Sequence, residues 1–208
     1  MTDEMLVRLR EDISRRLSNE RFAHTLSVER EVKDIADRLL PDRVGELRAA
    51  ALLHDLTKEL SLSEQVRICR ENAVVCSNEA LTSGAVLHGF TAALQIPSLY
   101  PCFASPDILS AVRYHTVGHP MMSTFDKILF LADYIESTRR YPDCIALRER
   151  FWNEINSVSS DQYLTSLDAA VFTEVKQTIA HLMKKNAVIA PESLALYNAY
   201  AARKDWQG

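Results

Sequence analysis

Several histidine and aspartate residues of the chain combine two features: their side chains bind metal ions, and their sequence neighbours are apolar. They are His24, His54, Asp55, His88, His115 and Asp133. The clearest surroundings are Ala51-Leu-Leu-His-Asp-Leu and Leu129-Phe-Leu-Ala-Asp-Tyr-Ile. An ionised carboxylate in an apolar segment is costly unless a cation or hydrogen-bond donors compensate it. Nothing basic lies one helical turn from Asp133, so a metal ion is its expected partner.

Each of these residues taken alone has a simpler explanation. A histidine on an apolar helix is more often a core residue bonded to a carbonyl, and a buried aspartate often bonds a helix end or an arginine. The ordered set favours a metal, because separate helices can bring such side chains to one point inside a bundle. Imidazoles and carboxylates without a thiolate suit iron, manganese, zinc or a similar ion. Six ligands exceed the needs of one tetrahedral ion, so we expect two ions.

The elements that must position these residues are predicted to be helices. The chain has only five glycines and no sustained period-two alternation, which argues against a β-rich fold. Capping boxes at Ser61-Leu-Ser-Glu64 and Ser123-Thr-Phe-Asp126, with Ser105-Pro106 and Pro191-Glu192, mark helix starts. We place helices at about 4–17, 20–40, 44–58, 62–72, 84–95, 106–115, 124–137, 144–156, 161–184 and 191–203. The longest loops are predicted at Gln95–Ser105 and Thr138–Asp143, within a single all-α domain over residues 1–208.

Composition narrows the class of protein further. The chain of 208 residues is 47% apolar and 25% charged, which is typical of globular proteins and excludes disordered or collagen-like chains. A net charge of −4 argues against a nucleic-acid partner, and no apolar run is long enough for a membrane span. The acidic start lacks the apolar segment of a signal peptide. We expect a cytoplasmic protein whose cysteines, Cys69, Cys76, Cys102 and Cys144, are reduced.

The order His, His-Asp, His, His, Asp resembles that of the HD-domain metal-dependent phosphohydrolases. The flanking segments are most similar to the YqeK-type symmetrical bis(5′-nucleosyl)-tetraphosphatases, which hydrolyse diadenosine tetraphosphate. The resemblance spans about residues 18–203. Its matching segments are Arg21-Phe-Ala-His-Thr-Leu, Ala50-Ala-Leu-Leu-His-Asp-Leu-Thr-Lys, Leu87-His-Gly, Val112-Arg-Tyr-His-Thr, Lys127-Ile-Leu-Phe-Leu-Ala-Asp-Tyr-Ile-Glu and Ile189-Ala-Pro-Glu-Ser-Leu.

The resemblance implies an HD-domain helical bundle with a two-metal site in its core. His24, His54, Asp55 and Asp133 would surround one divalent ion, and Asp55 would bridge to a second ion bound by His88 and His115. Iron comes first among the candidate metals, followed by manganese, cobalt and zinc. The implied reaction splits a dinucleoside polyphosphate, chiefly diadenosine tetraphosphate, at its centre into two ADP by a metal-activated hydroxide. The substrate would be this small nucleotide, and the protein would form a homodimer.

Three further residues are expected to contact the substrate: Lys58, Thr116 and Arg139. Lys58 follows His54 by one helical turn and joins Asp55 as a catalytic candidate. Adenine would stack on aromatic residues among Tyr114, Tyr134, Tyr141 and Phe90. Two positions depart from the family pattern. His119 stands where an arginine is usual, and the segment that begins at Ser137 lacks the proline that usually precedes an arginine there. The alternatives are another HD-type phosphohydrolase acting on a nucleoside mono- or triphosphate, and a non-catalytic nucleotide-binding helical domain.

Overall fold

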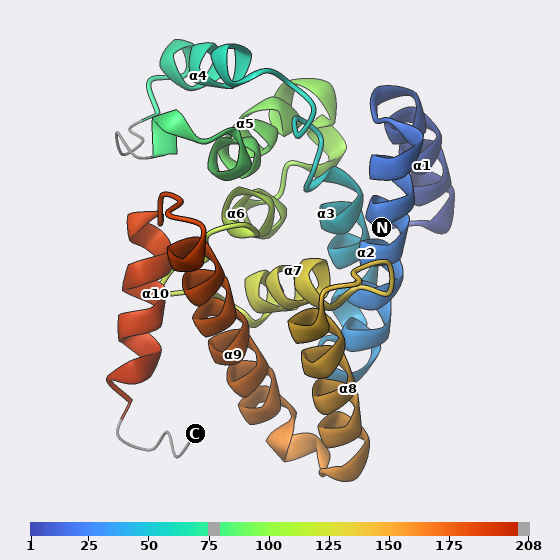
Figure 1. Ribbon diagram of the computed structural model, residues 1–208. Coiled ribbons are helices and arrows are strands. Elements are labelled where there is room, and N and C mark those ends of the chain that lie inside the picture. The colour runs from blue at the N-terminus through green and yellow to red at the C-terminus, as the bar shows by residue number, and fades with distance from the viewer. Residues whose placement is uncertain (75–79, 204–208) are drawn as a thin grey trace.

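The structure is a computed structural model that describes residues 1–74 and 80–203 (Figure 1). All regular elements of these residues are helices, so the predicted all-α fold is confirmed. The α-helices are α1 (Asp3–Arg16), α2 (Asn19–Leu39), α3 (Val44–Leu53), α4 (Leu62–Glu71), α5 (Gly84–Leu99), α6 (Pro106–Tyr114), α7 (Thr124–Ile135), α8 (Pro142–Ser157), α9 (Tyr163–Lys184) and α10 (Pro191–Ala201). Short 3₁₀ helices are η1 (Pro41–Arg43), η2 (Ala80–Thr82), η3 (Pro101–Phe103) and η4 (Ser160–Gln162).

Helix α3 is the most deeply buried part of the bundle. The side chains of Leu47 and of residues 49–53 are fully shielded from solvent. Three of them are alanines, whose small size lets neighbouring helices approach closely, and α1, α2, α6 and α7 all pack against α3. Residues 49–53 cover more than one helical turn and are all apolar, so this part of α3 belongs in the core on every side. The end of α3 therefore delivers the next residues, His54 and Asp55, into the interior.

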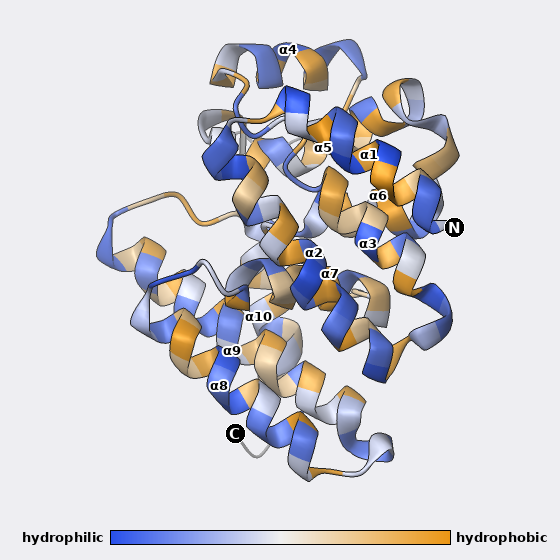
Figure 2. Ribbon diagram, turned by 90° about the vertical axis from the view of Figure 1, so that its right-hand side faces the viewer, coloured by the Kyte–Doolittle hydropathy of each residue, from blue (hydrophilic) through white to orange (hydrophobic). Residues whose placement is uncertain are grey.

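Helix α7 is a central helix that packs against both earlier and later helices of the chain. It lies between α6 and α2 on one side and α8 and α9 on the other (Figure 1). Helix α10 packs in turn on α9. The outer helices carry alternating hydrophilic and hydrophobic bands, as expected of helices with one face in the core (Figure 2). Asp133 sits near the C-terminal end of α7, so this central helix brings a carboxylate to the same interior as α3.

Most predicted helix starts are confirmed. Ser61 and Ser123 form complete capping boxes with Glu64 and Asp126, and the Ser105 side chain accepts a hydrogen bond from the Ile108 N–H. Pro191 occupies the first turn of α10. These local signals satisfy backbone donors that the helix itself leaves without partners, which is why they mark the boundaries.

Two predicted boundaries are wrong. The helix predicted at 44–58 ends at Leu53, and residues 54–59 form tight turns in which Leu56 N–H bonds Leu53 O and Lys58 N–H bonds Asp55 O. The helix predicted at 84–95 continues through Pro97 to Leu99, inside the predicted loop. The last turn is held by the buried Ile96, whose carbonyl accepts a 2.7 Å hydrogen bond from the Tyr100 N–H. Proline costs one hydrogen bond at this helix end without breaking the helix.

Two other expectations concern the thiols and membranes. Cys102 and Cys144 are thiols, the first exposed and the second buried, and Cys69 is buried. Cys76 lies outside the described residues. Among residues 1–74 and 80–203, no helix has the length and apolar character to cross a membrane.

Candidate metal centre

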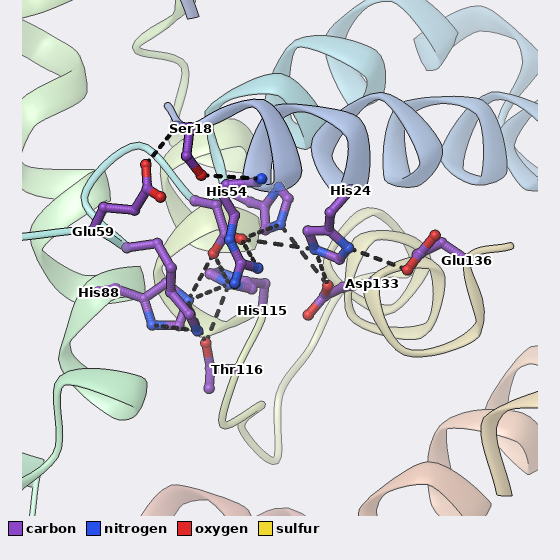
Figure 3. Close-up of polar contacts among 12 residues, drawn as sticks. Ser18, His24, His54, Glu59, His88, His115, Thr116, Asp133 and Glu136 are labelled. Atoms are coloured by element: carbon purple, nitrogen blue, oxygen red, sulfur yellow. Dashed lines mark hydrogen bonds and ion pairs between the residues drawn. The ribbon is translucent and has the colours of Figure 1, made fainter. Parts of the chain in front are cut away.

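The six predicted ligand residues converge on one place in the core. His24 comes from α2, His54 and Asp55 follow α3, and His88 comes from α5. His115 directly follows α6, and Asp133 lies on α7. The four imidazoles and Asp133 point toward one another in Figure 3. All six are buried except for part of Asp133, whose side chain is 19% exposed.

Helix ends fix two of the imidazoles. His54 Nδ1 lies 2.6 Å from Ala51 O, and His115 Nδ1 lies 2.7 Å from Val112 O. Each acceptor belongs to the last turn of a helix, where carbonyls lack their usual i+4 partners. Because a neutral imidazole carries one N–H, these contacts place the proton on Nδ1. The Nε2 lone pairs of both rings are therefore left facing the cluster, as metal ligands require.

One group of potential ligands contains His24, His54 and Asp133, whose ligand atoms all lie within 4.8 Å of one another. Asp133 Oδ1 is 3.0 Å from His24 Nε2 and 3.9 Å from His54 Nε2. The other nitrogen of His24, Nδ1, lies 3.2 Å from Glu136 Oε1. This carboxylate, 0% exposed, orients the His24 ring so that Nε2 points at the group.

A second group lies beside the first. His54, Asp55 and His115 also meet within 4.8 Å, and His88 Nε2 adds a contact of 2.9 Å to His115 Nε2. Asp55 faces both groups. Its Oδ1 is 3.1 Å from His88 Nε2, whereas its Oδ2 is 3.4 Å from His54 Nε2 and 3.7 Å from His24 Nε2.

The arrangement fits metal ions on the chemistry of its own atoms. His24 Nε2 and His54 Nε2 are buried and have no hydrogen-bond partner among the described residues. His88 Nδ1 lies 3.3 Å from Gly84 O; with the proton there, the Nε2 lone pairs of His88 and His115 face each other across 2.9 Å. Such lone pairs need a proton or a cation between them. Nitrogen and carboxylate ligands without sulfur match a first-row divalent ion.

Electrostatics keep the two carboxyls ionised. Burial raises the pKa of Asp55, but the charge and hydrogen bonds of His54 and His88 outweigh it and hold the pKa well below its usual range. Burial acts in the same way on Asp133, and Arg139 and His24 lower its pKa well below the ordinary value. Burial next to His88 and His54 lowers the pKa of His115. Burial lowers the pKa of His24, but its hydrogen bonds to Asp133 and Glu136 outweigh burial and raise the pKa to about 9. The two anionic carboxylates therefore attract positive charge to the cluster, as a cation site requires.

Arg139 corrects one expectation about Asp133. Its Nη2 lies 2.8 Å from Asp133 Oδ1 and its Nε donates to Asp133 O at 3.1 Å. Because α7 ends at Ile135, the chain turns back and brings an arginine six residues away onto the carboxylate. Arg148 Nη2 of α8 donates to Glu136 O and Arg139 O and so holds this turn. A metal is therefore not the sole cation available to Asp133.

Lys58 and Thr116 lie at the second group. Lys58 Nζ is 3.4 Å from both ring nitrogens of His88, and Thr116 Oγ1 is 3.2 Å from His115 Nε2. The helical face that Lys58 was predicted to share with His54 does not exist, because the chain leaves the helix at Leu53. Tight turns bring the ammonium to the site instead. Burial lowers the pKa of Lys58, and the nearby carboxylates of Asp55 and Asp133 offset this lowering only in part.

Sequence reasoning assigned no role to two residues that hold the site together. Arg21 Nη1 donates to Asp55 Oδ2 at 2.9 Å, and Glu136 orients His24. Both lie in the segments that carry the resemblance, one helical turn from His24 and three residues after Asp133, respectively. Their short distance in sequence from His24 and Asp133 was the signal that could have indicated a role at the site. Their partners are 34 and 112 residues away, so the contacts themselves are not readable from sequence.

The two departures from the family pattern follow candidate ligands closely in the sequence, His119 after His115 and Ser137 after Asp133. His119 Nδ1 accepts a hydrogen bond from the Met121 N–H, and its ring packs on Tyr114 with centroids 4.3 Å apart. Ser137 Oγ is 2.9 Å from Ser27 Oγ, which links the turn after α7 to α2. Both residues therefore make structural contacts in this chain.

Comparison with known proteins agrees with this geometry. The HD domain matches residues 21–138. A symmetrical bis(5′-nucleosyl)-tetraphosphatase of Halalkalibacterium halodurans is 32% identical over 88% of this chain and 89% of its own. The enzymes of the same description from Bacillus subtilis and Staphylococcus aureus are 30% and 26% identical, each over 89% of this chain and over 92% and 89% of their own.

A solved structure shares the fold. The crystal structure of a predicted HD superfamily hydrolase involved in NAD metabolism, from Clostridium acetobutylicum, superposes with a TM-score of 0.81. It covers 95% of this chain and 97% of its own length at 23% identity. This likeness supports the fold. The HD match over residues 21–138 and the relatives at 32% and 30% identity place the chain in a family. The chain belongs to the HD-domain phosphohydrolases of the YqeK type, the family of the symmetrical bis(5′-nucleosyl)-tetraphosphatases.

Proposed function

We propose that this chain hydrolyses dinucleoside polyphosphates, chiefly diadenosine tetraphosphate, symmetrically into two ADP. The observation that carries the proposal is the position of Asp55, whose two oxygens face the two groups of potential ligands. In this proposal His24, His54, Asp55 and Asp133 hold one divalent ion, and Asp55, His88 and His115 hold a second. Cleavage at the central anhydride is the activity named for the relatives that match most of the chain.

The protein residues divide the work of binding and orientation. The six histidine and aspartate residues would hold the divalent ions, and the chemistry that such ions would supply here is activation of water and compensation of phosphoryl charge. Lys58, beside His88, donates from its ammonium to a phosphate oxygen. Arg139 offers a guanidinium at the Asp133 end, and the Thr116 hydroxyl lies at the His115 end. Glu136 keeps Nε2 of His24 aimed at the cluster.

The nature of the metal follows from the ligand types. Imidazole and carboxylate ligands accept iron, manganese, cobalt and zinc, and we propose iron as the resident metal. Metal analysis of protein purified without chelators tests this directly. Two equivalents of iron per chain agree with the proposal, whereas one equivalent or less, without activation by added iron, cobalt or manganese, contradicts it.

The decisive assay compares nucleotides on the metal-loaded protein. Products of diadenosine tetraphosphate cleavage are separated by chromatography, and ADP is expected as the sole nucleotide product. Formation of ATP and AMP would show asymmetric cleavage and would contradict the proposal. A clear preference for nucleoside mono- or triphosphates would instead support another HD-type phosphohydrolase, and nucleotide binding without turnover would support a non-catalytic domain.

The setting of the enzyme is part of the same proposal. We propose a cytoplasmic enzyme that assembles as a homodimer, on the basis of the resemblance. Light scattering of the purified protein measures the mass of the particle in solution. A mass of one chain at micromolar concentration would contradict the dimer, and cell fractionation tests the location.

A further inference from the structure

Two pockets adjoin the candidate metal centre through lining residues that contact potential ligands, Arg139 in one pocket and Thr116 in the other. The first, which we call the aromatic pocket, has a volume of about 490 Å³ and lies between the end of α7, the start of α8 and the last turns of α9. Tyr134 and Tyr141 form aromatic walls, and the polar lining includes the Arg139 guanidinium, the His181 imidazole and the Asp143 carboxylate. Arg139 also contacts Asp133, so this pocket opens at the end of the cluster that contains His24 and Asp133.

The second pocket, which we call the hydroxyl pocket, has a volume of about 370 Å³. Its described lining is uncharged and combines apolar side chains with the hydroxyl groups of Thr82, Ser83, Thr116, Thr178 and Ser193. Thr116 Oγ1 lies 3.2 Å from His115 Nε2 and 3.3 Å from His88 Nε2. This pocket therefore opens at the other end of the cluster.

The two pockets meet on α9. Thr178 and Leu182, one helical turn apart, line both of them. The C-terminal turns of α9 lie below α6 and next to the start of α10 (Figure 1). Arg139 contacts Asp133 of the first ligand group, and Thr116 contacts His115 of the second group. A linear ligand that spanned the two pockets would therefore pass from one group to the other.

The wall of the hydroxyl pocket is a built part of the fold. Ser193 Oγ donates to Val117 O at 2.9 Å, which fastens α10 to the turn after His115. Gly118 in that turn has a φ of +64°, and a Cβ there would meet Leu196 Cδ2 at 2.4 Å. The turn is therefore shaped for contact with α10, and Thr116 is held between the cluster and the pocket.

We propose that the two nucleoside ends of one substrate occupy these two pockets, one in each, with the polyphosphate between them. This inference rests on the proposed function and adds where each half binds. Both volumes lie in the range of small-molecule sites, which is roughly 300–1,000 Å³. A substrate that is cut at its centre needs a nucleoside site on each side of the reacting groups.

The chemistry of the pockets makes the two halves unequal. The aromatic pocket combines two rings that can stack on a base with the hydrogen-bonding groups of Arg139, His181 and Asp143. The hydroxyl pocket has uncharged described walls and offers apolar contact and hydroxyl groups. The aromatic pocket is the tight site, and the hydroxyl pocket is the weak site that tolerates different nucleosides.

Titration of the manganese-loaded protein with ADP tests the arrangement by binding alone. We expect two ADP per chain, in one tight and one weak class. Ala187→Trp fills the hydroxyl pocket from an exposed position and should abolish the weak class, leaving the tight constant within about two-fold. Tyr141→Ala removes an exposed ring, 64% accessible, from the aromatic pocket and should weaken the tight class at least ten-fold.

Two control variants and a second filling variant show whether an effect comes from the pocket or from the substitution itself. Ala195→Trp and Tyr197→Ala change exposed residues of α10 that line neither pocket and should leave both classes unchanged. Ala85→Trp fills the hydroxyl pocket from its α5 side and should reproduce the effect of Ala187→Trp. In turnover, both filling variants should raise KM for diadenosine tetraphosphate at least ten-fold.

The outcomes separate this inference from the function. One ADP per chain in the unmodified protein, or filling variants that behave like Ala195→Trp, would overturn the two-pocket arrangement even if diadenosine tetraphosphate is cleaved symmetrically. Two ADP per chain with the expected variant pattern, but no cleavage, would overturn the proposed function and leave the two nucleotide sites supported.

Discussion

At the scale of single residues, Asp55 is the point where the two groups of potential ligands meet. One oxygen lies 3.1 Å from His88 Nε2 and the other 3.4 Å from His54 Nε2, and Arg21 donates to the second at 2.9 Å. Asp55 is only 2% exposed, so water does not compensate its charge. A buried carboxylate in this position needs compensating positive charge, and Arg21 supplies part of it.

Asp55→Asn keeps the size of the side chain and removes its charge. We expect turnover to fall by more than about a hundred-fold, because even residues that merely support metal ligands are worth 10–100-fold in affinity or activity. Bound metal should fall in parallel, which elemental analysis measures. The control Cys102→Ala alters an exposed thiol outside the site and should keep full activity. Equal losses in the two variants would mean that stability, not chemistry, is being measured.

Glu136→Gln tests the support of a single ligand. Glu136 is fully buried, and its Oε1 faces His24 Nδ1 at 3.2 Å. An amide in its place orients the ring less strongly and does not favour a basic Nε2, so we expect metal affinity to fall about 10–100-fold. A competition titration with a metal-binding dye measures the change. Glu149→Gln, at an exposed site on α8, is the matched control and should leave the affinity unaltered.

The six candidate ligands could be found from sequence because their types and apolar neighbours are visible there. The ion pair between Arg139 and Asp133 was missed, because it depends on where α7 ends and how the turn folds back. The role of Arg21 was missed for a similar reason, since Asp55, its partner, lies 34 residues away. Residue types are local information, whereas the partner of a buried charge is decided by the tertiary fold.

At the scale of elements, the close approach of α5 and α6 creates the second ligand group. Gly89 follows His88 and lies directly on the end of α6. A Cβ at Gly89 would meet Arg113 O at 2.8 Å, Val112 O at 3.0 Å and His115 Nδ1 at 3.3 Å. Backbone atoms cannot move aside as a flexible side chain can, so glycine is required for His88 and His115 to come within 2.9 Å.

Gly89→Ala should therefore separate α5 from α6 by a fraction of an ångström or more and weaken the second group. We expect loss of one metal equivalent per chain and at least a ten-fold drop in turnover, measured by elemental analysis and by ADP release. Gly84→Ala is the control on the same helix, because its Cβ meets the flexible Gln65 side chain at 3.3 Å. Retention of both metals in Gly89→Ala would refute the packing argument.

Helix starts were more predictable than helix ends. Ser61 and Ser123 mark the starts of α4 and α7, because their capping boxes involve neighbouring residues only. The end of α3 carries no comparable signal, since the apolar pattern runs on through Leu56 while the backbone turns at His54. The loop predicted from Gln95 contains Pro97, but the packing of Ile96 keeps α5 helical to Leu99. Tertiary packing overrides local propensity at both places.

At the scale of the whole molecule, α8 to α10 extend the core beyond the residues matched to the HD domain. The match ends at residue 138, and α8 and α9 pack against α7 from the other side. A polar contact also crosses this boundary. Trp152 Nε1 of α8 donates to Glu31 Oε1 of α2 at 2.6 Å, over 121 residues of chain. Glu31 is largely buried there, which makes its charge costly.

Burial raises the pKa of Glu31 to about 7, against the lowering effect of the Trp152 hydrogen bond. The folded-state pKa is thus above the unfolded value, so the folded protein binds the proton more tightly. Below about pH 4 both states are protonated and no cost arises. Between the two pKa values the unfolded state ionises first, and stability falls with rising pH until the full cost is reached above pH 7.

Glu31→Gln should remove this cost, because glutamine keeps an oxygen acceptor for Trp152 and carries no charge. We expect the variant to be more stable than the unmodified protein by about 1–3 kcal/mol at pH 8, since each unit of pKa shift is worth about 1.4 kcal/mol. The gain should shrink toward zero near pH 4. Urea unfolding at both pH values measures it, with Glu149→Gln as an exposed control. A gain independent of pH would show that packing, not the charge of Glu31, sets the strength of this junction.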